Sequence, residues 1–213
     1  MAERIDQKQK TRRKLIETTL KLSAERGFSS LSLREVAKSA GITPAAFYRH
    51  FRDMEDLGLT LIDEVGLGLR QILREARRTV DSRESSVRST IESFINYIAE
   101  NSNLFRVLQG ERQGATPAFR RALYSEFGRF IEEIADDIER RAANLKQTIY
   151  DSGLAAEAIV AVAFTVGSEA LDLPKHRREE LTERLIKEVR MILRGALTAD
   201  SNPKDKKSSL RKN

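Results

Sequence analysis

The sequence contains no cysteine, no tryptophan, two histidines and only four prolines among its 213 residues. The absence of cysteine excludes a disulfide framework, a thiolate metal site and a cysteine nucleophile. His50 and His176 lie far apart in the sequence, so we expect no histidine-based metal site. No stretch approaches about 18 uninterrupted apolar residues, and we therefore expect no membrane span. The first residues lack the apolar core of a secretory signal, which favours a cytoplasmic location.

Hydrophobic residues make up 40% of the chain and charged residues 33%, which is typical of a globular protein with a substantial core. The charge is unevenly distributed. Residues 1–52 hold 12 Lys/Arg and 5 Asp/Glu, whereas residues 53–199 hold 21 and 25. A localised basic excess is typical of a module that binds a polyanion, although a solvated basic face is an equally open interpretation. Residues 200–213 form a basic tail without apolar periodicity, which we expect to be disordered.

Apolar residues recur every three or four positions along the chain, and no convincing alternation with a period of two is present. This pattern predicts an all-α fold of about nine helices. The predicted helices cover residues 10–25, 32–40, 44–50, 54–80, 85–100, 104–111, 117–143, 153–171 and 177–197.

Two of the short helices are joined by Gly41-Ile42-Thr43, which predicts a helix-turn-helix. Gly41 permits a left-handed turn, and Thr43 is a suitable N-cap in front of Pro44. Ser32 and the glutamate three residues later form a capping box for the preceding helix. In a helix-turn-helix, the second helix places its first residues against base edges in the major groove of DNA.

This N-terminal segment resembles the TetR family of transcriptional regulators. The resemblance is carried by residues 11–16, 24–28, 32–37, 40–43 and 47–51. It implies a three-helix DNA-binding domain at residues 1–52 and a larger ligand-binding and dimerisation domain at residues 53–199. One departure is Met54, which stands where family members often carry a lysine that holds a phosphate. The corresponding contact moves to Arg52 or Arg49, or is absent.

We predict that the N-terminal domain binds double-stranded operator DNA. Small side chains at the start of the recognition helix permit close approach, and longer ones reach bases or phosphates. The predicted DNA-contacting residues are Thr11, Arg13, Ser32, Leu33, Arg34, Thr43, Pro44, Ala45, Ala46, Tyr48, Arg49, His50 and Arg52.

Further motifs resemble one group within the family, the FabR-type repressors of unsaturated fatty acid synthesis. They lie at residues 47–53, 57–60, 63–64, 69–71, 105–106, 111–112, 118–122 and 167–172. This resemblance implies an effector that is an acyl-CoA or acyl-carrier-protein thioester. It also implies that unsaturated thioesters favour the DNA-bound state and saturated ones oppose it. The residues themselves do not determine which thioesters favour DNA binding and which oppose it.

Apolar and aromatic residues of the middle helices form a stripe that can line a tunnel for an acyl chain. Ordinary core packing is the better interpretation of any single member. Two arginines near this stripe are predicted to face the phosphates of the acyl carrier, with an exposed helix charge as the alternative. The predicted effector-binding residues are Leu61, Val65, Leu69, Ile72, Phe94, Ile98, Phe105, Arg106, Leu108, Arg112, Phe119, Leu123, Phe127 and Phe130.

The helix at 153–171 is apolar almost all round and must be buried on more than one side. Together with the amphipathic helix at 177–197, it is predicted to pair with a second copy as a four-helix interface, with burial inside one subunit as the alternative. The predicted dimer residues are Ala158, Val162, Val166, Leu185, Val189 and Ile192.

Gly58, Gly66 and Gly68 interrupt the helix at 54–80, at a cost of about 1 kcal/mol each relative to alanine. A bend in the helix or the close approach of a neighbour would explain them, and we favour the bend.

Two other functions compete with a fatty acid repressor. A TetR-type sensor of another hydrophobic compound, such as a drug or an aromatic acid, fits the same sequence. A helical enzyme acting on acyl thioesters is disfavoured because the chain has no cysteine and no credible Ser/His/Asp order. We therefore predict no catalytic residues, no cofactor and no metal. A helical adaptor without a nucleic-acid role does not explain why the basic excess coincides with the helix-turn-helix.

Overall fold

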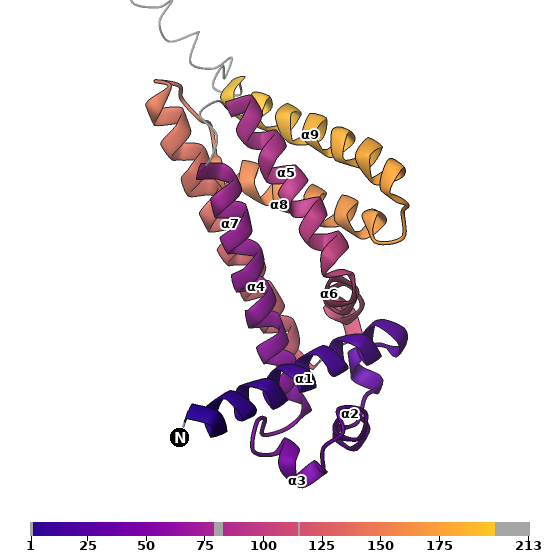
Figure 1. The fold of residues 1–213 in the computed structure, drawn as a ribbon. Coiled ribbons are helices and arrows are strands. Elements are labelled where there is room, and N and C mark those ends of the chain that lie inside the picture. Colours follow the sequence, from indigo (N-terminus) through magenta and orange to yellow (C-terminus); the bar gives the residue numbers. More distant parts are fainter. Residues whose placement is uncertain (1, 79–82, 115, 199–213) are drawn as a thin grey trace, which may run out of the picture. The chain divides into compact units, whose positions relative to one another are not determined.

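The computed structural model describes residues 2–78, 83–114 and 116–198. Within these ranges the chain forms nine α-helices and one 3-10 turn, and it contains no strand (Figure 1). The predicted all-α fold is therefore confirmed. The chain divides into two compact units, which we call unit 1 (residues 1–71 and 97–126) and unit 2 (residues 72–96 and 127–213).

Over the described residues the predicted helices agree with the structure to within three residues, except for the first. Residues 79–80 of the predicted helix 54–80 and the predicted tail at residues 200–213 lie outside the described residues. The first helix begins at Ala2 rather than at residue 10, and an ion pair between Lys10 and Asp6 (2.6 Å) supports its added turns. The third ends at Phe47 rather than at residue 50, because the amides of Arg49 and His50 donate to carbonyls only three residues back. The elements are α1 Ala2–Arg26, η1 Phe28–Ser30, α2 Leu33–Ser39, α3 Pro44–Phe47, α4 Met54–Arg78, α5 Arg83–Glu100, α6 Ser102–Gly114, α7 Pro117–Asn144, α8 Ser152–Ala170 and α9 Lys175–Thr198.

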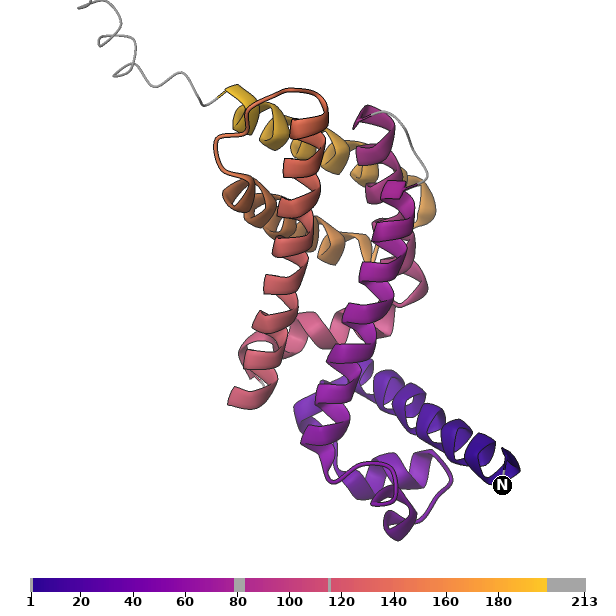
Figure 2. The ribbon, with the colours of Figure 1, turned by 90° about the vertical axis from the view of Figure 1, so that its left-hand side faces the viewer.

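In unit 1, α1, α2 and α3 gather around a common core (Figure 1, Figure 2). Leu15, Val36 and Phe47 are completely buried there. Close packing also explains the glycines of α4, so the bend that we favoured is the wrong explanation. A Cβ atom on Gly58 would lie 2.7 Å from the Phe28 ring and 2.9 Å from the ring of Phe119.

Arg12 connects α1 to the N-terminal half of α4 within unit 1. Its guanidinium donates to Glu64 Oε1 (2.9 Å) and to Thr60 Oγ1 (3.4 Å), both on α4. The same group lies 4.7 Å from the centre of the Phe51 ring, a cation–π distance. One arginine therefore holds α1, α4 and the segment after α3 together.

Unit 2 contains the hairpin of α8 and α9 (Figure 1). Phe164 of α8 lies at the centre of an aromatic cluster, with ring centroids 4.5 Å from Phe127, 5.9 Å from Phe94 and 6.2 Å from Phe130. Among the described residues, α8 is the one helix long and apolar enough to cross a membrane. Half of that stretch is buried against other helices, which explains its composition as that of a core helix.

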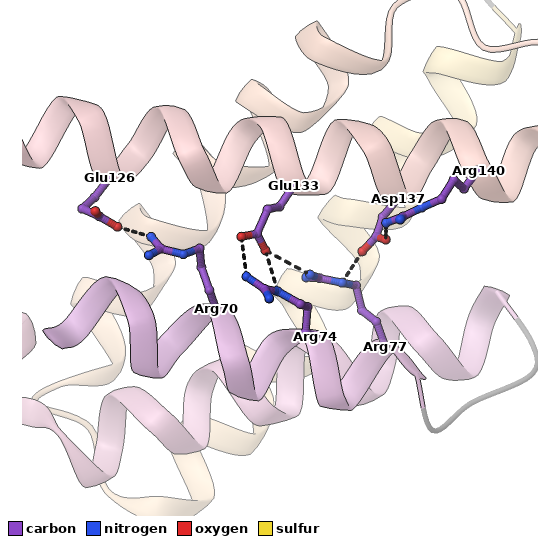
Figure 3. Close-up of polar contacts among 7 residues, drawn as sticks. All are labelled: Arg70, Arg74, Arg77, Glu126, Glu133, Asp137 and Arg140. Atoms are coloured by element: carbon purple, nitrogen blue, oxygen red, sulfur yellow. Dashed lines mark hydrogen bonds and ion pairs between the residues drawn. The ribbon is translucent and has the colours of Figure 1, made fainter. Parts of the chain in front are cut away.

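Arginines of α4 face acidic residues of α7 (Figure 3). In unit 1, Arg70 pairs with Glu126, and both side chains are almost completely buried. A Cβ atom on Gly66 would collide with the Glu126 carboxylate, so this glycine makes room for the pair. Removing one partner of a buried ion pair strongly destabilises a protein, because the remaining charge stays buried without a counter-charge.

The corresponding pairs of unit 2 lie further along the same two helices. Arg74 binds Glu133 at 2.8 Å, and Arg77 pairs with Asp137. Arg140 also binds Asp137 from its own helix. Charge matching in this part of unit 2 therefore joins α4 to α7.

We expect Glu126→Leu to lower the free energy of unfolding by about 3–5 kcal/mol, because the buried guanidinium of Arg70 loses its counter-charge. Urea unfolding followed by circular dichroism measures the change. The double variant R70M/E126L should recover most of the loss. The exposed pair of Arg88 and Glu183 provides the control, and Glu183→Leu should have little effect. An E126L protein as stable as the wild type would contradict the prediction.

Candidate nucleic-acid interface and effector cavity

The turn between α2 and α3 has the predicted geometry. Gly41 has a φ angle of 71°, in the left-handed region that glycine adopts without strain. The next amide, of Ile42, donates to the carbonyl of Ala37 (2.9 Å) and closes the end of α2. The side chain of Ile42 packs against the unit 1 core. These contacts confirm the turn of the helix-turn-helix.

Both predicted helix caps are present. The Ser32 hydroxyl accepts from the amide of Glu35 (3.3 Å), and the Thr43 hydroxyl accepts from the amide of Ala46 (3.1 Å). The Glu35 carboxylate also binds the guanidinium of Arg26. This bond lowers the pKa of Glu35 most, and the amide of Ser32 lowers it further. The start of α2 is thereby attached to the end of α1.

The recognition segment exposes the side chains that were predicted to contact DNA. Phe47 points into the core and is completely buried, whereas the ring of the next residue, Tyr48, is 62% exposed. The Tyr48 ring packs edge-on against Phe47, with centroids 6.0 Å apart. Ala45 and Arg49 are also exposed. The short α3 and the turn that follows it therefore expose a small, an aromatic and a basic side chain.

Not all the basic groups of unit 1 are equally available. Arg34 and Arg49 are exposed and have no carboxylate partner within the described ranges. Arg52, in contrast, pairs with Asp56 at the start of α4 (3.3 Å), and Arg13 pairs with a glutamate one turn along α1 (3.2 Å). Arg34 and Arg49 can bind phosphates without losing an ion pair, whereas the other two must exchange a partner.

His50 is half-buried, and its Nδ1 atom is enclosed without a hydrogen-bond partner in the part of the chain that the structure describes. Burial lowers the pKa of His50, and the positive charges of Lys8, Arg49 and Arg12 lower it further. Protonation is therefore disfavoured at neutral pH. That His50 contacts DNA stays a prediction, and a neutral imidazole would make the contact.

The structure places all the predicted DNA-contacting residues on unit 1, and none of them is buried. Lys14 was missed, although its amine lies beside the turn, 3.6 Å from the position of a Cβ atom on Gly41. Its spacing of three residues from Thr11 on α1 would have indicated a shared face. The half-buried members are Thr11, Leu33, Ala46 and His50, and the exposed ones are Arg13, Ser32, Arg34, Thr43, Pro44, Ala45, Tyr48, Arg49 and Arg52.

Unit 2 contains a cavity of about 100 Å³, which we call the unit 2 cavity. All its lining residues belong to this unit and come from α4, α5, α7, α8, α9 and the segment before α8. Its wall is mostly aliphatic, with Ile91, Ile138 and Leu193 among the contributors. Two charged residues on the wall, Arg77 and Asp137, form an ion pair, and a third charged group is Arg141.

The predicted effector-binding residues whose side chains the structure describes lie elsewhere in the two units. None of those that the structure describes lines the unit 2 cavity, and their role stays a prediction. The side chains of Val65 and Arg112 fall outside the described part. In unit 1, Leu61, Leu69, Ile98, Phe105, Phe119 and Leu123 are buried, and Arg106 and Leu108 are half-buried. In unit 2, Phe94 and Phe130 are buried, and Ile72 and Phe127 are half-buried.

A groove follows the outer face of α8 and α9, and we call it the α8–α9 face. Apolar residues such as Met191, which is 71% exposed, line it together with the charged residues Glu169, Arg184 and Glu188. Three of the predicted dimer residues, Val162, Val166 and Ile192, line it. The other three differ: Leu185 and Val189 are buried inside unit 2, and Ala158 is half-buried. Where side chains are described, no group of acidic residues and histidines is arranged to hold a metal ion.

Comparison with protein families identifies both parts of the chain. Residues 15–60 match the bacterial regulatory proteins of the tetR family. Residues 84–192, more than half of the chain, match the tetracyclin repressor-like C-terminal domain. The protein therefore belongs to the TetR family of transcriptional regulators, as the sequence motifs predicted. The finer resemblance to FabR-type repressors stays a prediction.

Solved structures share the fold at low identity. A TetR-family regulator from Syntrophomonas wolfei has a TM-score of 0.77 at 18% identity, with 90% of this chain and 99% of that chain covered. The fatty acid degradation regulator FadR from Bacillus halodurans has a TM-score of 0.73 at 17% identity, covering 86% and 94%. A TetR-family regulator from Rhodococcus has a TM-score of 0.68 at 21% identity, covering 86% and 99%.

We expect Tyr48→Ala to weaken binding to a duplex selected by the wild-type protein from random sequences. The Kd should rise about tenfold or more, since a specific base contact is worth about 1–3 kcal/mol. Tyr124, which is 66% exposed on α7, provides the matched control, and Tyr124→Ala should bind normally. Fluorescence anisotropy measures both Kd values. A Y48A protein within about twofold of wild type would refute the role of Tyr48.

Proposed function

We propose that this protein is a ligand-responsive transcriptional repressor that binds operator DNA as a homodimer. The observation that carries the proposal is the exposed set of Ala45, Tyr48 and Arg49 on a capped helix-turn-helix of a TetR-family chain. Regulators of this family bind DNA in general and are not enzymes in general. Because such regulators act on chromosomal DNA, we propose a cytoplasmic location for this protein.

The exposed face of α2 and α3 supports a division of labour at DNA. Ala45 is small enough for the backbone of α3 to approach base edges closely, and its methyl group can touch a thymine methyl. Tyr48 and Arg49 extend beyond it and are the candidates for base or phosphate contacts. Arg34, exposed at the start of α2, is placed for a phosphate, which fixes register without reading sequence.

Two recognition helices are needed to read a symmetric operator, with half-sites about 34–36 Å apart or a multiple of that spacing. The α8–α9 face supports the second copy. Val162, Met191 and Ile192 give it apolar surface, and Glu169 and Arg184, which also line it, form an ion pair (2.8 Å). Apolar side chains beside polar ones are the usual composition of a protein interface.

For the effector we propose a fatty acyl thioester, acting on genes of unsaturated fatty acid synthesis or desaturation. The support comes from the sequence motifs of residues 118–122 and 167–172 and from the abundant apolar side chains of both units. A structural neighbour, FadR, is described as a regulator of fatty acid degradation. Coupling between effector and DNA of about 1–3 kcal/mol would change DNA affinity 5–150-fold.

A second candidate effector is a smaller hydrophobic compound, and the size of the unit 2 cavity favours it. At about 100 Å³ the cavity is somewhat smaller than the engineered cavity of about 150 Å³ that holds benzene, so a single ring is the largest body that it can take. It is also well below the 300 Å³ or more of pockets that enclose drug-sized ligands. A compound with one ring or a short chain fits this volume better than a long acyl chain does.

We expect Met191→Glu to convert the dimer into a monomer, because two charges would face each other across an apolar interface about a two-fold axis. Sedimentation velocity measures the mass in solution. Leu67, which is 62% exposed on α4, provides the control, and Leu67→Glu should remain dimeric. A wild-type protein that sediments as a monomer would reject the proposed interface.

We expect acyl thioesters to shift operator affinity. Gel-shift titrations on promoters of unsaturated fatty acid synthesis genes, at one salt concentration, compare the protein alone with palmitoyl-CoA and oleoyl-CoA. The two thioesters should move the Kd in opposite directions, over a total range of about 5–150-fold. If the protein binds the DNA but neither thioester changes the Kd, the acyl effector is rejected and the repressor function stands.

A further inference from the structure

The unit 2 cavity contains a positive charge without a matching negative one. Of its charged residues, Arg77 is satisfied by Asp137 and, at 3.8 Å, by Glu133. Arg141 is half-buried on the same wall, and within the described ranges it has no carboxylate partner. Its Nη2 atom donates to the carbonyl oxygen of Arg77 (3.1 Å), which leaves the other N–H groups of the guanidinium available.

The two arginines lie close enough to affect each other. Burial lowers the pKa of Arg77 most, Asp137 and Glu133 raise it, and the charge of Arg141 lowers it again. An arginine does not relieve such repulsion by releasing its proton, because its pKa is too high. An anion beside Arg141 would relieve it, and the partly buried setting strengthens that attraction relative to water.

The remainder of the wall determines what such an anion must be attached to. Most of it is apolar, as at Ile91, Ile138, Ala142 and Leu193, and Ser86 and Thr90 add two hydroxyl groups. A ligand that matches both the guanidinium of Arg141 and the apolar part of the wall has a compact apolar body and one anionic group. A carboxylate suits the guanidinium best, because its two oxygens can accept two parallel N–H bonds.

We propose that the unit 2 cavity binds a small carboxylic acid, with a single ring or a short aliphatic body, as its carboxylate on Arg141. The inference rests on the proposed repressor function and on the second effector candidate above, the small hydrophobic compound, whose chemical class it names. A fatty acyl thioester would not fill this role, because its linkage carries no charge and its chain exceeds the cavity.

Isothermal titration calorimetry on the full-length protein tests the charge requirement. The probes are benzoate and benzamide, which share a ring and differ in charge. We expect benzoate to bind wild-type protein about 10–100-fold more tightly, as for one charge-assisted hydrogen-bonded pair.

Variants of Arg141 then identify the residue that recognises the charge. Arg141→Gln should abolish the preference for benzoate while leaving benzamide binding within about twofold. Arg141→Lys keeps the charge without the planar fork and should retain part of the preference. Arg121, an exposed arginine of α7 outside the cavity wall, provides the matched control, and Arg121→Gln should behave as wild type. Circular dichroism verifies that each variant is folded.

Equal affinities for the two probes, a benzoate preference that survives in folded R141Q, or no binding of either probe up to about 10 mM would each overturn the proposal. Failure of the repressor function is visible separately. A wild-type protein that selects no duplex from random sequences would reject the DNA-binding role, whereas the calorimetry would still decide the ligand. A duplex bound normally by a protein that binds no carboxylate would reject the ligand alone.

Discussion

The burial of two phenylalanines determines where the side chains that we predict to contact DNA lie. The α3 helix has a single turn and cannot hold its conformation alone, because a helix this short is marginal in water. Phe47 and Phe51 are almost completely buried, one on each side of the exposed segment. Since both ends of that segment are fixed in the core, Tyr48 and Arg49 have to project outward. The recognition surface is therefore a product of hydrophobic packing and only secondarily of helix propensity.

The enclosed charged residues of this protein are of two kinds, which differ in whether a residue of opposite charge is paired with them. Arg70 and Glu126 are buried together, and each compensates the cost of removing the other from water. Arg77 of unit 2 follows the same rule with Asp137. Arg141 departs from it, since it is partly enclosed by aliphatic groups without an acidic partner in the described ranges. Such a departure is unusual for structural charges and is common at binding sites.

Features governed by neighbouring residues could be predicted from the sequence, and features governed by helix packing could not. The turn at Gly41 and the cap at Thr43 depend on one glycine φ angle and one hydroxyl, and both were predicted correctly. The role of Gly58 depends on two rings from distant segments, and the bend was the wrong choice. The unit 2 cavity was missed for a related reason. A wall residue such as Ile138 has the same helical periodicity as a core residue, and only the arrangement of the helices separates them.

The bond from Arg141 to the Arg77 carbonyl has a consequence for α4. A side chain of α7 is held there by a main-chain oxygen of α4, so the two helices are joined through the backbone as well as through ion pairs. Any molecule that reorients this guanidinium would weaken that connection. Faster amide hydrogen exchange in this part of α4 would then report the occupancy of the neighbouring space.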